Sequence, residues 1–233
     1  MAKIKAVLWD LDSTLIDYHI PERNAIIKCF DEFGLGQCPE EFLNTYHDVN
    51  VKWWDKLEKG LMTKERITVG RFEEMLSAFG YDSSIASEFN RSYMEHLSDT
   101  VCPIDGAKET LTALHGKVFQ AIATNGVERT QRRKIINGGF DNLVDRIYIS
   151  DVLGADKPAL EFYNKILEDL SGFEKDEIMM VGDSLTSDMT GGNNAGLVCC
   201  WFNPEHKVCN LPLKIDYEIS SLKDVLEVID ELA

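Results

Sequence analysis

Short apolar runs along this chain alternate with helical patterns, and together they predict a repeating order of strand and helix. The apolar runs occupy residues 4–9, 118–124, 146–150, 178–181, 197–202 and 217–219. Continuous apolar runs of this length are typical of strands that are buried on both faces of a parallel sheet. Amphipathic stretches such as residues 159–170 separate the later runs. The pattern predicts an α/β fold with a doubly wound parallel sheet.

The segment after the first run breaks this alternation. Apolar positions at three- and four-residue spacing begin near Ala25 and stop at Gly34, which predicts a helix. Three further helices are expected over residues 40–59, 63–79 and 84–97. We therefore predict a four-helix insertion at residues 17–99, with residues 1–16 and 100–233 forming the α/β core.

Two carboxylates, Asp10 and Asp12, stand directly after the first apolar run. Open α/β sheets bind ligands at the carboxyl ends of their strands, so both are candidate ligand-binding residues. At about 5 Å, two carboxylates repel each other by about 3 kcal/mol at an effective dielectric constant of 20, unless a cation or a shared proton relieves them. The pair indicates a Mg²⁺ site, although the same residue types also serve as turn and cap residues.

Three later segments favour the metal site over simple capping. Thr124-Asn125-Gly126 ends the second run with groups that can hold phosphate oxygens. Lys157, which alone is typical of a surface lysine, precedes Pro158, and Pro158 suits the first position of the next helix. Asp183 ends another buried run, and Asp188, one helical turn later, can point back to the same edge. Four acids at one edge of a sheet are hard to explain as caps.

With these motifs in this order, the chain resembles the haloacid dehalogenase superfamily of aspartate-nucleophile phosphohydrolases. The matching motifs are Asp10-x-Asp12-x-Thr14, Thr124, Lys157 and Gly182-Asp183-x-x-x-x-Asp188. Softer similarities lie at Ile122–Gly126, Gly191–Gly196 and Cys200–Asn203. They indicate the subgroup of pyrimidine 5'-nucleotidases that remove non-standard nucleotides. Ser13 departs from the Gly or Glu that relatives often carry, which weakens the inference about the substrate.

The resemblance implies a role for each acid. Asp10 would be the nucleophile that forms an aspartyl phosphate, and Asp12 would protonate the leaving oxygen and then deprotonate the attacking water. Mg²⁺ would be bound by Asp10, the backbone carbonyl of Asp12 and Asp183, with Asp188 in direct or water-mediated support. The expected reaction is Mg²⁺-dependent hydrolysis of a small-molecule phosphate ester, with a nucleoside monophosphate as the expected substrate.

Three further residues would act on the phosphoryl group. Thr124 and the backbone N–H of Asn125 would bind its oxygens. Lys157 would offset the negative charge of the nucleophile and of the phosphate. The chemistry would thus combine residues that follow four different predicted strands.

The inserted helices would form the cap that closes over the active site in this superfamily and selects the substrate. Trp53, Trp54 and Phe72 offer flat aromatic surface, and Arg71 offers a fork of donors, which together suit a base with carbonyl acceptors. Packing within the cap is the alternative for each aromatic ring. Arg71 is the better candidate for substrate contact, since an arginine is seldom needed for packing.

Three other functions use related residues. A sugar-phosphate or phosphoglycolate phosphatase, or a phosphomutase, would share every catalytic residue and differ only in its substrate. A haloacid dehalogenase needs no metal, so Asp12 and the acidic motif at Asp183 count against it. A receiver-type signalling module also surrounds a phosphorylated Asp with acids, Thr and Lys, but it is much shorter and carries that Asp on a later strand.

Net charge, cysteine spacing and the absence of long apolar stretches limit the possible binding partners and cellular compartment of the protein. A formal net charge of −16 argues against binding to nucleic acid or to an anionic membrane, both of which need a basic face. The six cysteines lack metal-like spacing and are expected as free thiols, with Cys199 and Cys200 on opposite faces of one strand. Neither a membrane-spanning apolar stretch nor a signal peptide is found, so we expect a cytoplasmic protein. The oligomeric state is left open.

Overall fold

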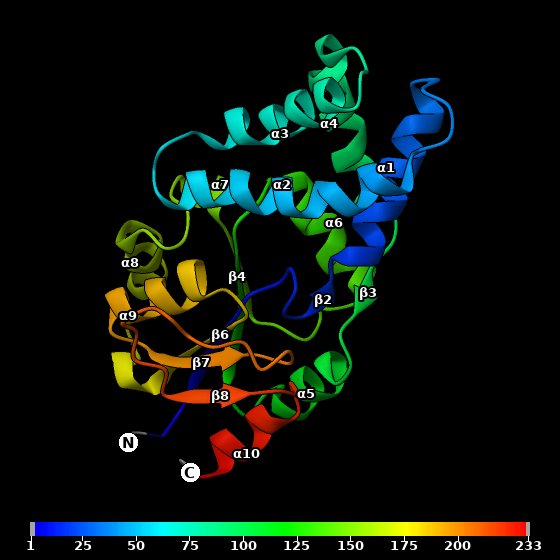
Figure 1. The fold of residues 1–233 in the computed structure, drawn as a ribbon. Coiled ribbons are helices and arrows are strands. Elements are labelled where there is room, and N and C mark those ends of the chain that lie inside the picture. Colours follow the sequence, from blue (N-terminus) through cyan, green and yellow to red (C-terminus); the bar gives the residue numbers. More distant parts are fainter. Residues whose placement is uncertain (1–2, 232–233) are drawn as a thin grey trace. The chain divides into compact units, whose positions relative to one another are not determined.

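The computed structural model describes residues 3–231, and the chain divides into two compact units. One unit contains the chain up to Tyr18 and again from Val101 onward, and the other contains His19–Thr100. Figure 1 shows a strand-containing part and a part made of helices. The second unit is therefore an insertion into the first.

The first unit is built on a six-stranded sheet with the order β5-β4-β1-β6-β7-β8 (Figure 1). Its strands are β1 (Ala6–Trp9), β4 (Phe119–Thr124), β5 (Arg146–Ile149), β6 (Ile178–Gly182), β7 (Val198–Phe202) and β8 (Tyr217–Ile219). All neighbouring pairs are parallel. Each strand coincides closely with a predicted run, so the prediction of a parallel sheet is confirmed. Because these strands are parallel, the loops after β1, β4 and β6 leave the same edge of the sheet. They are neighbours there, because β1 lies between β4 and β6.

Helices cover both faces of this sheet, which makes it doubly wound. They are α5 (Ala107–Leu114), α6 (Glu128–Gly138), α7 (Ser150–Leu153), α8 (Leu160–Asp169), α9 (Thr190–Ala195) and α10 (Asp224–Glu231), with a 3-10 turn η2 (Lys175–Glu177). Val7 and Trp9 pack with α5, α6 and α10, while Ala6 and Leu8 pack with α8 and α9. The alternation follows from the two-residue period of a strand.

The two neighbouring cysteines of β7 follow the same rule. Cys200 lies in the core beneath α5, α6 and α10, and Cys199 lies in the core beneath α8 and α9. Both are free thiols, as are the other four cysteines. The expectation of opposite faces and of free thiols is confirmed.

Local details differ from the sequence prediction at two places. Two short strands, β2 (Ile16–Asp17) and β3 (Cys102–Pro103), pair in antiparallel fashion, and strands of two residues are too short for a periodicity to reveal. Helix α8 begins at Leu160, because Ala159 has extended backbone geometry. Pro158 therefore lies before the helix, and the prediction that it is the first helical residue was wrong.

The second unit contains the four predicted helices. They are α1 (His19–Glu32), α2 (Glu40–Glu58), α3 (Lys64–Ala78) and α4 (Ala86–His96), the last preceded by a 3-10 turn η1 (Ser83–Ile85). The Thr63 side chain caps the start of α3 by accepting a hydrogen bond from the backbone N–H of Arg66. Aromatic rings from all four helices fill the interior of this unit, and they are Phe30, Phe42, Tyr46, Phe72, Phe89 and Tyr93.

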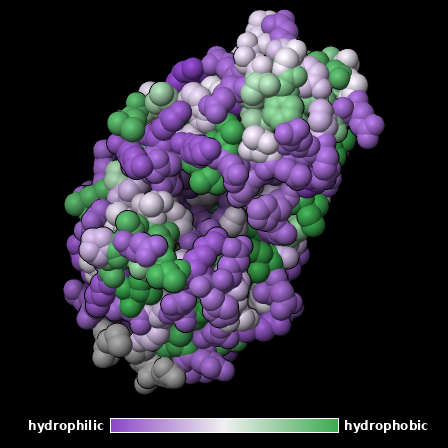
Figure 2. Space-filling model, viewed as in Figure 1, coloured by the Kyte–Doolittle hydropathy of each residue, from purple (hydrophilic) through white to green (hydrophobic). Residues whose placement is uncertain are grey.

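The face of the molecule in view in Figure 2 is mainly hydrophilic. Figure 2 shows hydrophobic residues as separate patches among hydrophilic ones on the face in view. Large exposed apolar residues include Val51, Leu61 and Val208. Among residues 3–231, no helix combines the length and the apolar character that crossing a bilayer requires.

Candidate active site

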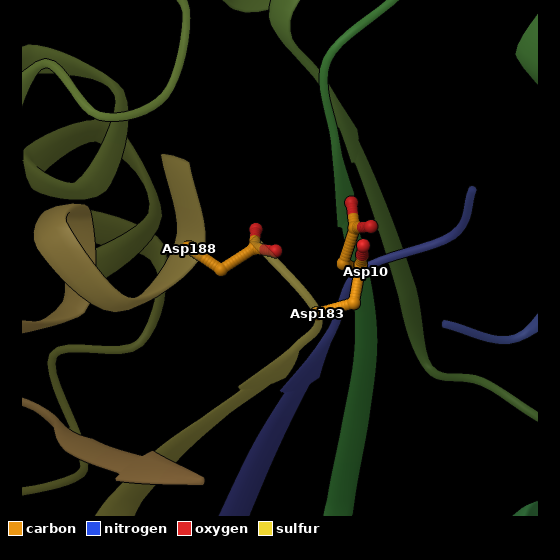
Figure 3. A group of neighbouring side chains, drawn as sticks. All are labelled: Asp10, Asp183 and Asp188. Carbon is orange, nitrogen blue, oxygen red and sulfur yellow. The ribbon is translucent and has the colours of Figure 1, made fainter. Parts of the chain in front are cut away.

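Three carboxylates meet at the edge of the sheet where β1 and β6 end (Figure 3). Asp10 follows β1 directly, and its backbone N–H donates to the carbonyl of Val181 on β6 at 2.9 Å. Asp183 follows β6, and Asp188 comes from the π-helix η3 (Leu185–Met189) just beyond it. One carboxylate oxygen from each acid lies within 4.8 Å of the other two. The acids predicted from two distant motifs are thus brought together.

Asp188 is fixed in this position by its own loop. Its Oδ2 accepts a hydrogen bond from the backbone N–H of Ser184 at 3.1 Å, and the side chain is fully buried. The Ser184 hydroxyl in turn accepts from the N–H of Ser187 at 3.1 Å, which caps the π-helix. The wider turn of a π-helix is often found at functional sites. Here it aims Asp188 at Asp10 and Asp183 (Figure 3).

Lys157 provides the cation that pairs with two of these acids. Its Nζ donates to Asp10 Oδ1 at 2.6 Å, to Asp188 Oδ1 at 2.7 Å and to the carbonyl of Ala123 at 2.8 Å. An ammonium has three N–H donors, so this set accounts for all of them. Only 2% of Lys157 is exposed, which excludes the alternative of a surface lysine. Burial opposes its charge, but Asp10 and Asp188 together raise the pKa of Lys157 above its ordinary value.

Asn125 holds the backbone on which Lys157 stands. Its side-chain Nδ2 donates to the carbonyl of Lys157 at 3.0 Å, and its Oδ1 accepts from the Lys157 backbone N–H at 2.9 Å. The amide side chain therefore joins the loop after β4 to the segment before α8. This positioning function was not predicted, and the phosphate-binding role of the Asn125 backbone stays a prediction.

Thr14 links the two acids that follow β1 and β6. Its Oγ1 accepts from the backbone N–H of Asp183 at 3.1 Å and lies 3.2 Å from Asp183 Oδ1. The same hydroxyl lies 3.5 Å from Asp10 Oδ2. The indole N–H of Trp201 adds a bond of 2.9 Å to the carbonyl of Asp183. These bonds hold Asp183, just after β6, close to Asp10 and Thr14.

The charges at this edge do not balance within the protein. Burial and the neighbouring Asp188 raise the pKa of Asp183 to about 7. Burial, followed by repulsion from Asp188, raises the pKa of Asp10 above its ordinary value despite the opposing attraction of Lys157. Three carboxylates with one ammonium leave an excess of negative charge, and their oxygens are the ligand type that Mg²⁺ prefers. The donor set therefore fits a hard divalent cation.

Asp12 stands apart from these three acids and has partners of its own. Ser13 has a left-handed backbone (φ 66°), and its N–H donates to the carbonyl of Ile16 at 2.8 Å, which turns the chain after Asp12. Lys134 Nζ donates to Asp12 Oδ1 at 2.7 Å, and Gln131 Nε2 donates to Asp12 Oδ2 at 2.8 Å. Sequence reasoning missed both partners. Their three-residue spacing on a helix that follows Thr124 was the signal that could have found them, because it places them on one face.

Thr124 lies at the same edge, at the end of β4, and is 1% exposed. Its Oγ1 accepts a hydrogen bond of 2.8 Å from Gln131 Nε2. Gly126, in the same loop, donates its N–H to the Ser150 hydroxyl at 3.2 Å. Five motif residues, Asp10, Thr124, Lys157, Asp183 and Asp188, therefore gather at the end of three neighbouring strands.

Three of the four residues expected to contact a base are buried inside the helical unit. Phe72 is fully buried and packs against Tyr46, Phe89 and Tyr93, so it is a core residue. Trp53 is also buried, and its indole N–H donates to Glu74 at 2.8 Å. Both side chains therefore take part in packing within the helical unit, and their contact with a substrate stays a prediction.

Arg71 is buried as well, with 1% of its surface exposed. Its guanidinium donates to Asn50 Oδ1 at 2.5 Å and to Asn90 Oδ1 at 3.2 Å, and its Nε donates to the carbonyl of Thr68 at 3.1 Å. The arginine thus ties α3 to α2 and α4, a packing role that the sequence did not predict. Of the four residues of the helical unit predicted to contact substrate, Trp54 on α2 is the one that keeps part of its surface exposed.

Comparison with known proteins identifies the family. The family model of haloacid dehalogenase-like hydrolases matches residues 4–196, so the chain belongs to this family of hydrolases. Pyrimidine 5'-nucleotidase PynA of Streptococcus pneumoniae is 31% identical over 228 residues, which cover 97% of this chain and 95% of PynA. The magnesium-bound structure of the putative HAD-hydrolase YfnB of Bacillus subtilis has a TM-score of 0.92 and 29% identity, and the match covers 98% of this chain and 99% of YfnB. Glyceraldehyde 3-phosphate phosphatase of Pyrococcus furiosus is 26% identical, over 99% of this chain and 95% of that protein.

Proposed function

We propose that this hydrolase is a Mg²⁺-dependent phosphomonoesterase that works through an aspartyl phosphate, with pyrimidine nucleoside 5'-monophosphates as its substrates. The observation that carries the reaction type is the arrangement around Asp10. Asp10 directly follows the central strand β1, its carboxylate pairs with the buried ammonium of Lys157, and it lies with Asp183 and Asp188 in a group of three acids. A nucleophile with an adjacent cation site is the combination that phosphoryl transfer needs.

The metal would be held by Asp10, Asp183, the backbone carbonyl of Asp12 and, directly or through water, Asp188. When bound, Mg²⁺ supplies positive charge to the phosphoryl oxygens and offsets the mutual repulsion of these carboxylates. The fit is supported by burial and by the neighbouring negative charge, which together raise the pKa of Asp10 and of Asp183.

The protein residues divide the hydrolysis into two steps. In the first step, a carboxylate oxygen of Asp10 attacks phosphorus, the ester P–O bond breaks, and the carboxyl proton of Asp12 passes to the leaving oxygen. In the second step, a water oxygen attacks phosphorus, the bond to the Asp10 oxygen breaks, and the water proton passes to Asp12. Two such steps replace one of the slowest reactions known in water.

The other site residues act on charge and geometry. Lys157 lowers the repulsion between the nucleophile and the incoming phosphate. Thr124 and the backbone N–H of Asn125 bind the transferring phosphoryl oxygens. Thr14 holds Asp183 beside Asp10.

The substrate proposal is supported by the similarity to PynA over nearly the full length of both chains. The similarity to a glyceraldehyde 3-phosphate phosphatase, also over nearly full length, supports a sugar phosphate or another small phosphate ester as the second candidate. Specificity constants decide between them. We expect higher values for dUMP, dTMP and UMP than for hexose phosphates, glyceraldehyde 3-phosphate or phosphoglycolate. A higher value for any of the latter would overturn the nucleotidase proposal and leave the phosphatase proposal standing.

The reaction type is tested by Asp10→Asn, which keeps the shape of the side chain and removes the nucleophile. We expect loss of measurable phosphatase activity, and loss of activity in the wild type when a chelator removes Mg²⁺. A phosphorylated protein should be trapped by acid quench in the wild type and not in the variant. Turnover like that of the wild type in Asp10→Asn, or full activity in excess chelator, would contradict the mechanism.

A further inference from the structure

The two α6 side chains that bind Asp12 occupy both of its carboxylate oxygens. Lys134 Nζ donates a hydrogen bond to Oδ1 at 2.7 Å, and Gln131 Nε2 donates one to Oδ2 at 2.8 Å. We propose that Gln131 and Lys134 are positioning residues for the acid/base Asp12, and that they fix its orientation for proton exchange in both steps. The proposal rests on the proposed function, in which Asp12 exchanges a proton with the leaving oxygen and with water.

The burial of Lys134 shows that this pairing is specific. The residue is 2% exposed, and a buried ammonium is strongly destabilising unless it is paired. Asp12 is its ion-pair partner, and the ring of Tyr18 lies 4.8 Å from Nζ on another side. Arg132, two residues earlier on the same helix, is exposed and pairs with Glu128 of the same helix. Helix α6 therefore buries one cation at the site and leaves another in solvent.

Gln131 adds a link between Asp12 and Thr124, at the end of β4. Its Nε2 donates to Asp12 Oδ2 and to Thr124 Oγ1, each at 2.8 Å. A Cβ at Gly126 would lie 2.8 Å from the Gln131 side chain, so the glycine leaves the space that this amide occupies. One amide group thus sets the spacing between the acid/base and a predicted phosphate ligand.

Each carboxylate oxygen has two lone pairs, so one donor on each oxygen leaves acceptor capacity for a proton. Two donors from one rigid helix restrict the rotation of the carboxylate, and the remaining lone pairs then point in fixed directions. Proton transfer depends strongly on such geometry. Without Lys134, Asp12 keeps its chemical identity but loses this restraint.

The test separates the two steps with p-nitrophenyl phosphate and Mg²⁺ in rapid-mixing experiments. p-Nitrophenolate leaves without needing a proton, so the initial burst reports attack by Asp10, and the following steady state reports hydrolysis of the aspartyl phosphate. For Lys134→Met we expect a burst rate within about threefold of wild type and a steady-state rate at least ~10-fold lower, with phosphorylated protein accumulating. With UMP, whose leaving group needs the proton of Asp12, turnover should fall at least ~10-fold.

Matched variants distinguish positioning from general damage. Gln131→Met should slow both phases, because it also removes a bond to Thr124. Lys134→Arg, which keeps a charged donor, should recover the steady-state rate to within about threefold, and the exposed Arg132→Met should equal wild type. Lys134→Gln, which keeps a donor without the charge, provides a second measurement of the restraint and should lie between Lys134→Met and wild type.

Equal slowing of both phases in Lys134→Met and Lys134→Gln, or no slowing in either variant, would overturn the inference. The proposed function fails by a different result, namely a wild type that forms no phosphorylated protein or that turns over without a divalent cation. The two failures are therefore distinguishable in one set of experiments.

Discussion

Gly182 and Asp188 are in direct contact, with no room for any side chain between them. A Cβ on Gly182 would lie 2.3 Å from Asp188 Oδ2 and 2.4 Å from its Cγ. The last residue of β6 therefore has to be glycine for Asp188 to reach Lys157. Gly182 is therefore required for a steric reason: a larger residue would push Asp188 out of the site.

We expect Gly182→Ala to displace Asp188 and to lower kcat at least ~10-fold, with a loss of about 1–3 kcal/mol in the free energy of unfolding from overpacking. Steady-state kinetics and chemical denaturation measure the two effects. Gly172→Ala is the matched control, because nothing lies within 4 Å of a Cβ at Gly172. Unchanged kinetics in Gly182→Ala would contradict the proposed role of Asp188.

Lys157→Ala should lower turnover at least ~10²-fold, because it removes the buried cation that offsets the charge on Asp10 and on the phosphate. Substrate hydrolysis at saturating Mg²⁺ is the measurement. Lys117→Ala, at an exposed position, serves as the control. A rate equal to wild type in Lys157→Ala would show that this ammonium is needed only for the fold.

Metal-free protein should lose stability as the pH rises, and Asp183 should contribute to this loss. Its pKa of about 7 in the folded protein lies above the ordinary value of 3.8, so the folded state binds more protons than the unfolded state between these values. The stability penalty is absent below the lower value, grows through this range and is complete above the higher one.

Asp183→Asn removes this titrating charge. In EDTA, we expect the variant to be more stable than wild type near pH 8, by about 1–4 kcal/mol, and the difference to shrink as the pH falls toward 5. Denaturation curves across this pH range measure it, with the exposed Asp141→Asn as the control. A difference that grows toward low pH would have the wrong sign and would rule out this account.

Phe72→Ala should act on stability rather than on substrate choice. Removing a fully buried ring costs about 3–5 kcal/mol, whereas Leu61→Ala, at a residue that is 68% exposed, should stay within about 0.5 kcal/mol of wild type. Thermal unfolding and the KM for UMP are the two readouts. A stable Phe72→Ala variant with a selectively raised KM for nucleotides would restore the substrate-contact hypothesis.

The sequence was sufficient to predict the sheet and most of the residues at its carboxyl edge, because both can be recognised from short stretches of sequence. A buried parallel strand shows as a continuous apolar run, and Asp10, Thr124 and Asp183 each stand at the end of one. Strands that lie side by side in a parallel sheet bring their carboxyl ends together, so these residues had to be neighbours once the fold was known.

Burial of charged residues could not be predicted in the same way. Arg71 is buried because Asn50 and Asn90, from two other helices, meet its guanidinium. Lys134 is buried because α6 passes beside Asp12. In each case the partner lies far away in sequence, and a polar helix position without its partner is indistinguishable from a solvated one.

The two hydrogen bonds between the Asn125 side chain and the backbone of residue 157 hold this position independently of its side chain. The side-chain amide of Asn125 bonds to the backbone N–H and carbonyl of residue 157, not to the lysine side chain. The loop that carries the ammonium therefore does not need the ammonium in order to form. Position 157 can accept another side chain, by engineering or by evolution, without dismantling the turn that presents it, so new reactivity could arise here on an unchanged support.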